Sequence, residues 1–200
     1  MEGLFKKALE YATLKHQGMK RKDGSDYITH PIEVTTIANT ITNDEEVLST
    51  CMLHDVPEEC DVSIDEIKEL FGDRVGKLVD LETELKYSDI PKKESWILRK
   101  TEAIRRLNTT DDIGFKIVYL SDKLANLRSL YKDYQVNGLH AFDKFNVNDV
   151  NQQAWYYCSV LDELSELKDT EAYKEYEKYI NEIFKDYRRD NNNGKNSNTL

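Results

Sequence analysis

Long apolar runs are missing from this 200-residue chain. A membrane-spanning helix needs about 18 or more consecutive apolar residues, and no such stretch occurs. The first seven residues, MEGLFKK, also lack the apolar core of a secretory signal peptide. We therefore expect neither a membrane span nor an export signal.

Cysteine is scarce, because the chain has only Cys51, Cys60 and Cys158. These residues form no CxxC pair and no even set that could close a disulfide framework. This usage favours a reducing, cytoplasmic location, where thiols persist. Nothing around Cys51 indicates a nucleophilic thiolate, so we interpret the cysteines as packing residues.

Positive charge is also in short supply. Lys and Arg number 28 against 38 Asp and Glu, which gives a net charge of −10. A nucleic-acid groove needs a basic surface, so we expect no nucleic-acid partner. A phosphate-rich small molecule could bind only where a metal and local cations reverse the sign of the field. The basic run at residues 20–22 is the strongest candidate for those cations.

The sequence also lacks two common phosphate-binding motifs and the alternating pattern of a β-strand. The chain has no GxGxxG sequence, no P-loop lysine, no sustained β-alternation and no internal repeat. Helical spacing of apolar residues runs through most of the sequence instead. We predict an all-α domain over residues 1–188, followed by a disordered polar tail over residues 189–200.

Capping residues divide this pattern into separate helices. The spacing predicts a first helix from Leu4 to His16, and a second with Pro31 at its first position. Asn43–Asp44 can cap a third helix, and Ser63 opens a capping box on the next. Gly72 is predicted to end that helix, and Asp73 and residues 111–112 are predicted to cap later helices. Segment 135–150 is predicted to be irregular, and Tyr173 to Tyr187 form the apolar stripe of a final amphipathic helix.

The polar segment 87–94 contains Pro91 and is interpreted as a loop. Our hypothesis is that this loop acts as a lid.

The pair His54–Asp55 is the most informative polar feature. It ends the apolar run of the third predicted helix, where an imidazole and a carboxylate cost free energy unless something pairs them. Neutral imidazole and carboxylate oxygen both bind divalent cations, and neighbouring residues on a helix can reach one ion. The pair therefore predicts a metal site.

Two further ligands are suggested elsewhere in the chain. His30 stands at a predicted helix entrance, and Asp122 interrupts the apolar run from Ile117 to Leu124. Alone, each has an ordinary alternative: a surface or capping histidine, and an aspartate that faces water or pairs with Lys123. Together with His54 and Asp55 they form a four-ligand set that suits Mn²⁺, Fe²⁺ or Zn²⁺.

Glu58 and Glu59 follow the metal pair by about one helical turn. A carboxylate at that place can orient or deprotonate an attacking water, so both are candidate catalytic residues, Glu58 before Glu59. The alternative is a solvated acidic loop. A solvated acidic loop is a common feature in a chain with 38 acidic residues, so that alternative stays open.

Substrate-binding candidates follow from charge and helix spacing. Arg21 and Lys22 can clamp phosphate, and the alternative is a solvated turn. Asn126 lies four residues after Asp122, hence on the same helix face, where it can bind a substrate or simply face solvent. Arg128 is off that face and could reach a neighbouring helix or phosphate. Tyr27 is interpreted as a packing residue.

Three segments resemble motifs of the RelA/SpoT-type HD hydrolase domains. They are residues 16–31, HQGMKRKDGSDYITHP; residues 53–59, LHDVPEE; and residues 120–130, LSDKLANLRSL. Their order and spacing agree with that family, and the resemblance covers roughly residues 4–185. No synthetase domain follows, so the chain is similar to the stand-alone small alarmone hydrolases.

The resemblance implies an all-helical HD-domain bundle that binds one Mn²⁺ ion through His30, His54, Asp55 and Asp122. It implies hydrolysis of the 3′-pyrophosphate of guanosine 3′,5′-bis(diphosphate). By position, Glu58 and Glu59 would handle the catalytic water. The residues implied to contact the nucleotide are Arg21, Lys22 and Asn126.

The sequence departs from the family at three places. Glu59 stands where aspartate is usual, Met19 replaces a usual glutamine, and Ala125 replaces a usual histidine. A longer carboxylate arm can shift the group by about an ångström, and such shifts can cost ~100-fold in rate. Two alternatives to the guanosine alarmone therefore stay open. One is a different nucleotide, either an adenosine analogue of the alarmone or NADPH; the other is a weakly active nucleotide-binding regulatory module. The sequence leaves the oligomeric state undetermined.

Overall fold

The computed structural model describes residues 3–186, and within that range the chain forms helices and no β-strand. This confirms the all-α prediction. The α-helices are α1 (Leu4–Lys15), α2 (Thr29–Ala38), α3 (Glu45–Leu53), α4 (Val56–Glu59), α5 (Ile64–Phe71), α6 (Asp73–Glu82), α7 (Trp96–Thr109), α8 (Ile113–Asn137), α9 (Val150–Glu163) and α10 (Glu171–Ile183), with short 3₁₀ helices η1 (Gly138–Phe142) and η2 (Ser165–Leu167).

Several helix boundaries lie where the sequence predicts them. The carboxylate of Asp44 accepts hydrogen bonds from the first-turn N–H groups of α3, and the hydroxyl of Ser63 accepts one from Glu66 N–H at 3.1 Å. Gly72 ends α5 with φ of 96°, a conformation that glycine adopts without strain. These caps satisfy backbone groups that the helices leave unpaired.

Three boundary predictions are wrong in detail. Helix α2 begins at Thr29, so Pro31 is its third residue and not its first. Proline is tolerated there too, because the N–H groups of a first helical turn have no hydrogen-bond partner within the helix. Gly72 also serves as the cap of α6, which makes Asp73 the first helical residue. Helix α8 ends at Asn137 and η1 follows it, so segment 135–150 is irregular only in part.

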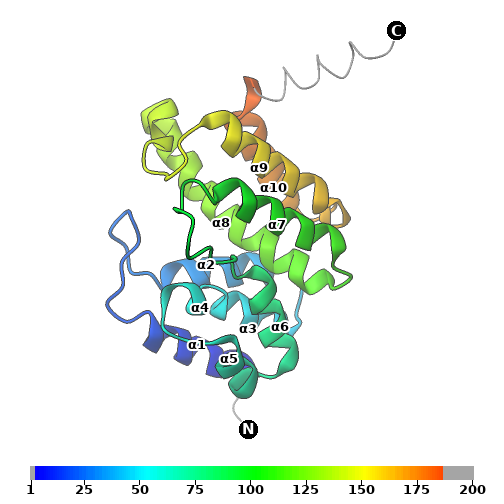
Figure 1. Ribbon diagram of the computed structural model, residues 1–200. Coiled ribbons are helices and arrows are strands. Elements are labelled where there is room, and N and C mark those ends of the chain that lie inside the picture. The colour runs from blue at the N-terminus through cyan, green and yellow to red at the C-terminus, as the bar shows by residue number, and fades with distance from the viewer. Residues whose placement is uncertain (1–2, 187–200) are drawn as a thin grey trace.

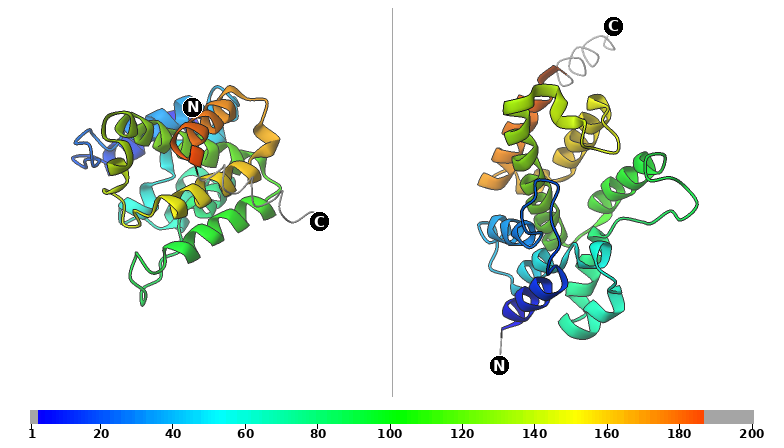
Figure 2. Two further views of the ribbon diagram at one scale, coloured as in Figure 1. Left: turned by 90° about the horizontal axis from the view of Figure 1, so that it is seen from above. Right: turned by 90° about the vertical axis from the view of Figure 1, so that its left-hand side faces the viewer.

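Helix α8 organises the bundle. Its N-terminal part, from Gly114 to Asp122, is buried without a gap, and beyond it only Leu124, Ala125, Leu127 and Leu130 are buried. One hydrophobic cluster surrounds it and includes α2, α9 and α10, and a second cluster joins α1, α3, α5 and α6. In Figure 1, α1 and α5 lie at the end of the molecule near the N-terminus, and α9 and α10 lie at the other. Figure 2 shows α7 and the segment before it at one side of the bundle.

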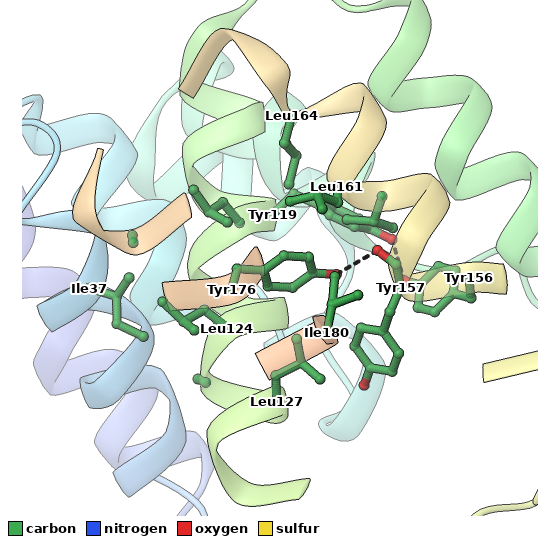
Figure 3. Close-up of a cluster of buried hydrophobic side chains, with 14 of the residues drawn as sticks. Ile37, Tyr119, Leu124, Leu127, Tyr156, Tyr157, Leu161, Leu164, Tyr176 and Ile180 are labelled. Atoms are coloured by element: carbon green, nitrogen blue, oxygen red, sulfur yellow. Dashed lines mark hydrogen bonds between the residues drawn. The ribbon is translucent and has the colours of Figure 1, made fainter. Parts of the chain in front are cut away.

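The cluster around α8 is rich in tyrosine. Figure 3 shows Tyr176 of α10 pointing toward α9, where its hydroxyl donates to the carbonyl oxygen of Tyr157 at 3.3 Å. The hydroxyls of Tyr119 and Tyr156 share another hydrogen bond of 2.6 Å. Buried tyrosines need such partners, so these contacts fix how α8, α9 and α10 face one another.

The predicted tail, residues 189–200, lies outside the described residues, as do positions 187–188 of the predicted domain and Tyr187 of the predicted stripe. Among residues 3–186, no helix combines the length and the apolar character that crossing a membrane requires.

Candidate metal centre and active-site cleft

Three separate parts of the bundle bring the predicted metal ligands together. His30 lies in the first turn of α2, and Asp122 lies in the middle of α8. His54 and Asp55 occupy the junction where α3 ends and α4 begins. Because α2 and α3 both pack against α8, residues 30, 54 and 122 meet in the interior.

The ligand atoms converge on one point. Atom Nε2 of His30 lies 2.9 Å from Oδ1 of Asp122, and Nε2 of His54 lies 3.6 Å from the same oxygen. The ligand atoms of these three residues all lie within 4.8 Å of one another. The carboxylate of Asp55 completes the group, at 3.3 Å from His54 Nε2 and 3.6 Å from His30 Nε2.

His54 shows that this group fits a cation. Its Nδ1 lies 2.8 Å from the carbonyl oxygen of Cys51, so Nδ1 carries a hydrogen and Nε2 is the atom that can ligate a cation. Nε2 is buried and has no hydrogen-bond partner. Burial alone would lower the pKa of His54, but the carboxylates of Asp55 and Asp122 raise it to about 10, so a positive charge is favoured at this point. A divalent cation at Nε2 would supply that charge in place of a proton.

Neighbouring side chains hold the carboxylates of the two predicted aspartate ligands. Tyr27 donates a hydrogen bond of 2.8 Å to Oδ2 of Asp55, and its ring stacks on buried His16. Asn126 donates one of 2.8 Å to Oδ1 of Asp122. The interpretation of Tyr27 as a packing residue alone is therefore wrong. Its partner is 28 residues away in the chain, which local pattern does not reveal.

Glu58 and Glu59 differ in their surroundings. Glu58 is half-buried, and its Oε1 accepts a hydrogen bond of 2.6 Å from the N–H of Glu84. Burial is the main cause of the raised pKa of Glu58. Glu59 is exposed. Both residues line the same cleft as His30, Asp55 and Asp122, and of the two only Glu58 is held in place by a backbone hydrogen bond.

This cleft has a volume of about 710 Å³ and is open to solvent. Residues 20–23, which we call the entrance loop, form one side of it. Lys20 is paired with Asp26 at 2.6 Å. Arg21 lies 3.5 Å from Oδ1 of Asn126, and Lys22 donates to the carbonyl oxygen of Lys144 at 3.0 Å. In the described part of the chain, neither Arg21 nor Lys22 is ion-paired with a carboxylate, so both charges remain for a ligand.

Another side of the cleft carries charges of which sequence analysis named only Lys123, as a possible partner of Asp122. We call this set the inner wall; it consists of Glu82, Glu84, Arg99, Lys100 and Lys123. Lys123 forms ion pairs with Asp122 and with Glu82, the latter at 3.1 Å. Arg99 and Lys100 of α7 both pair with Glu84. The adjacent pair Asp122–Lys123, within the run from Ile117 to Leu124, was the sign of this network that the sequence offered.

Electrostatic effects bind the inner wall together. The two cations of α7 hold the pKa of Glu84 at about 2, although burial opposes this. Burial lowers the pKa of Lys100, and nearby Lys123 lowers it further. Arg128, by contrast, points away from the site and links α8 to Glu175 of α10 and Glu33 of α2. Its reach to neighbouring helices agrees with the sequence prediction.

Comparison with protein families places the chain among known domains. A family model described as HD domain matches residues 8–143. The GTP pyrophosphokinase rsh of Brucella melitensis biotype 1 is 37% identical over 131 residues, or 64% of this chain and 17% of that protein. A guanosine-3′,5′-bis(diphosphate) 3′-pyrophosphohydrolase of Aquifex aeolicus is 35% identical over 125 residues, with 62% and 17% covered. The chain thus spans less than a fifth of the length of these curated relatives.

Two solved structures match more completely. One, described as a metazoan ortholog of SpoT that hydrolyses ppGpp and plays a role in starvation responses, has a TM-score of 0.68 and 30% identity. The match covers 93% of this chain and 96% of that one. A crystal structure of a Listeria monocytogenes EGD-e protein has a TM-score of 0.67 and 28% identity, with 78% and 99% covered. The predicted resemblance to RelA/SpoT-type HD domains is confirmed.

Proposed function

We propose that this chain, which belongs to the HD-domain family and within it to the RelA/SpoT type, hydrolyses the 3′-pyrophosphate of guanosine 3′,5′-bis(diphosphate). The products are pyrophosphate and GDP, or GTP from the 5′-triphosphate form. The observation that carries the proposal is the buried, unpartnered Nε2 of His54, which lies beside the carboxylates of Asp55 and Asp122 at a cleft that cations also line. A solved relative of nearly the same extent, described as hydrolysing ppGpp, supports the substrate.

His30, His54, Asp55 and Asp122 would hold one divalent cation, and we propose Mn²⁺ because imidazole and carboxylate ligands together suit it. Such an ion supplies Lewis acidity toward phosphoryl oxygen and lowers the pKa of water that it binds. Tyr27 and Asn126 keep the ligand carboxylates turned toward it. Three free thiols in the described chain fit a reducing, cytoplasmic setting.

Protein side chains would handle the proton of the attacking water and bind the phosphate groups. Glu58 is held by the backbone of Glu84 and can take a proton from the attacking water. Water oxygen adds to the phosphorus bonded to the 3′ oxygen, the bond between that phosphorus and the 3′ oxygen breaks, and the 3′ oxygen takes up a proton. Arg21 and Lys22 bind phosphate at the cleft entrance, where their charge offsets the net charge of −10.

A nucleotide panel tests the proposal. Purified protein is incubated with guanosine 3′,5′-bis(diphosphate), its adenosine analogue and NADPH, with Mn²⁺ and after chelation, and products are identified by chromatography. We expect pyrophosphate and GDP from the guanosine compound, and loss of turnover after chelation. Turnover of the other nucleotides alone would contradict the substrate, and binding without turnover of any would contradict the enzymatic role.

A further inference from the structure

The α7 part of the inner wall carries more positive charge than its own acid neutralises. Arg99 and Lys100 share a single carboxylate, that of Glu84. Lys123 of α8 is already paired with two carboxylates, those of Glu82 and Asp122. Atom Nε of Arg99 is buried and has no hydrogen-bond partner. A covered cationic cluster with a spare charge and a spare donor favours binding of an anion.

The tyrosine core holds these cations in place. The ammonium group of Lys100 lies 4.6 Å from the ring centre of Tyr156, and that of Lys123 lies 4.4 Å from the ring centre of Tyr119. The two rings are joined by their hydroxyl groups at 2.6 Å. The positions of both charges are therefore fixed before a ligand arrives, which reduces the entropy lost on binding.

The inner wall and the entrance loop suit different parts of a nucleotide. Lys22 is exposed at the open side, where a bulky nucleoside has room, whereas side chains of Lys100 and Lys123 are only 17% and 15% exposed. The metal centre lies between the two sets, since Asp122 contacts Lys123 on one side and Asn126 on the other. A compact, highly charged group fits the covered side better than a nucleoside does.

We infer that the inner wall is a subsite for the distal phosphate of the 3′-pyrophosphate, with Arg99 and Lys100 as its main contacts. The inference rests on the proposed function and sharpens it. The subsite makes the enzyme select a diphosphate ester over a monophosphate ester at the same position. It also makes released pyrophosphate a ligand of α7.

The test compares the hydrolysis of two substrates by two lysine variants. The substrates are guanosine 3′,5′-bis(diphosphate) and guanosine 5′-diphosphate 3′-monophosphate, which differ only in the distal phosphate. Lys100→Met removes the charge and keeps an apolar stem over Tyr156. Lys116→Met is the matched control, because Lys116 is also covered and paired with one glutamate, Glu166, but does not line the cleft.

We expect Lys100→Met to lower kcat/KM for the diphosphate ester by ~10–100-fold, the usual effect of losing a charge-assisted contact. The value for the monophosphate ester should change less than about 2-fold, because that substrate never makes the contact. Lys100→Arg should recover part of the loss, and Lys116→Met should leave both values unchanged. Equal losses on both substrates in Lys100→Met would overturn the inference.

Binding of inorganic pyrophosphate gives a second readout that does not need turnover. Calorimetry at a fixed free Mn²⁺ concentration should show a ~10-fold or greater rise in its Kd in Lys100→Met and no change in Lys116→Met. An unchanged Kd in Lys100→Met would also overturn the inference. If the wild-type protein cleaves neither substrate, the proposed function fails, and the pyrophosphate Kd still decides the subsite. Should Lys100→Met fail to fold, Arg99→Gln takes its place in both measurements.

Discussion

The two sides of the cleft use positive charge in different ways. The entrance loop carries Arg21 and Lys22 near solvent without a carboxylate partner in the described chain. The inner wall carries Arg99, Lys100 and Lys123 under cover, each paired with a glutamate. Free, exposed cations can be lost with little effect on folding, whereas covered ion pairs support the fold as well as the ligand. The comparison therefore separates residues that bind from residues that bind and stabilise.

The metal centre between the two sides should show the largest effect of a single change. Asp55→Ala removes one ligand carboxylate and should lower kcat/KM by ~1,000-fold or more, because neither side of the cleft can replace it. The measurement is steady-state hydrolysis together with Mn²⁺ content after dialysis. Unchanged turnover would show that Asp55 is not a metal ligand and would contradict a metal centre between the two sides of the cleft.

Removing the inner-wall lysine of α8 should cost stability. Lys123→Met leaves the buried carboxylates of Glu82 and Asp122 without this partner, and we expect a loss of about 3 kcal/mol in the free energy of unfolding. Urea denaturation measures this. The control is Lys174→Met, which breaks the exposed pair with Glu171 and should leave the midpoint unchanged. A loss as small as that of the control would show that the inner wall does not hold the fold.

Changing the entrance loop should affect binding and spare stability. Arg21→Lys keeps the charge and loses the planar fork, so KM should rise by ~10-fold with the urea midpoint unchanged. Steady-state kinetics and denaturation on the same preparation check both parts. If the urea midpoint falls as KM rises, Arg21 supports the fold as well as the ligand. The claimed difference between the entrance loop and the inner wall would then be wrong.

The smallest expected effect concerns the support of the metal ligands. Tyr27→Phe removes the hydrogen bond to Asp55 and should weaken Mn²⁺ binding by about 10-fold, the lower end for such supporting contacts. Electron paramagnetic resonance of free Mn²⁺ measures the affinity without turnover. Tyr11→Phe is matched to it, because Tyr11 also donates to a carboxylate, that of Glu66, outside the site. Equal affinities in the two variants would assign Tyr27 to packing.

How far the sequence predicts this molecule depends on how local each feature is. Caps such as Asp44 and Ser63 act within one turn, so the pattern identified them before the structure did. The structure brings His30, His54 and Asp122 together. The sequence indicated His54 and Asp122 by their place in apolar runs, and His30 by its place at a helix entrance. That these residues and Asp55 hold one ion stays a prediction.

Features that depend on tertiary contacts were not predicted. Glu84 and Lys100 look like ordinary surface charges in the sequence, and only the packing of α7 beside the cleft makes them partners. The role of Tyr27 likewise depends on a residue 28 positions away. Side chains that meet across helices have no fixed spacing along the chain, so periodicity carries no information about them.

The central claim is that water attacks the phosphorus bonded to the 3′ oxygen at this metal centre. Hydrolysis of guanosine 3′,5′-bis(diphosphate) in ¹⁸O-labelled water, followed by mass spectrometry of both products, tests it most directly. We predict one ¹⁸O atom in the pyrophosphate and none in the GDP. Label in the nucleotide product, or release of monophosphate in place of pyrophosphate, would contradict the account.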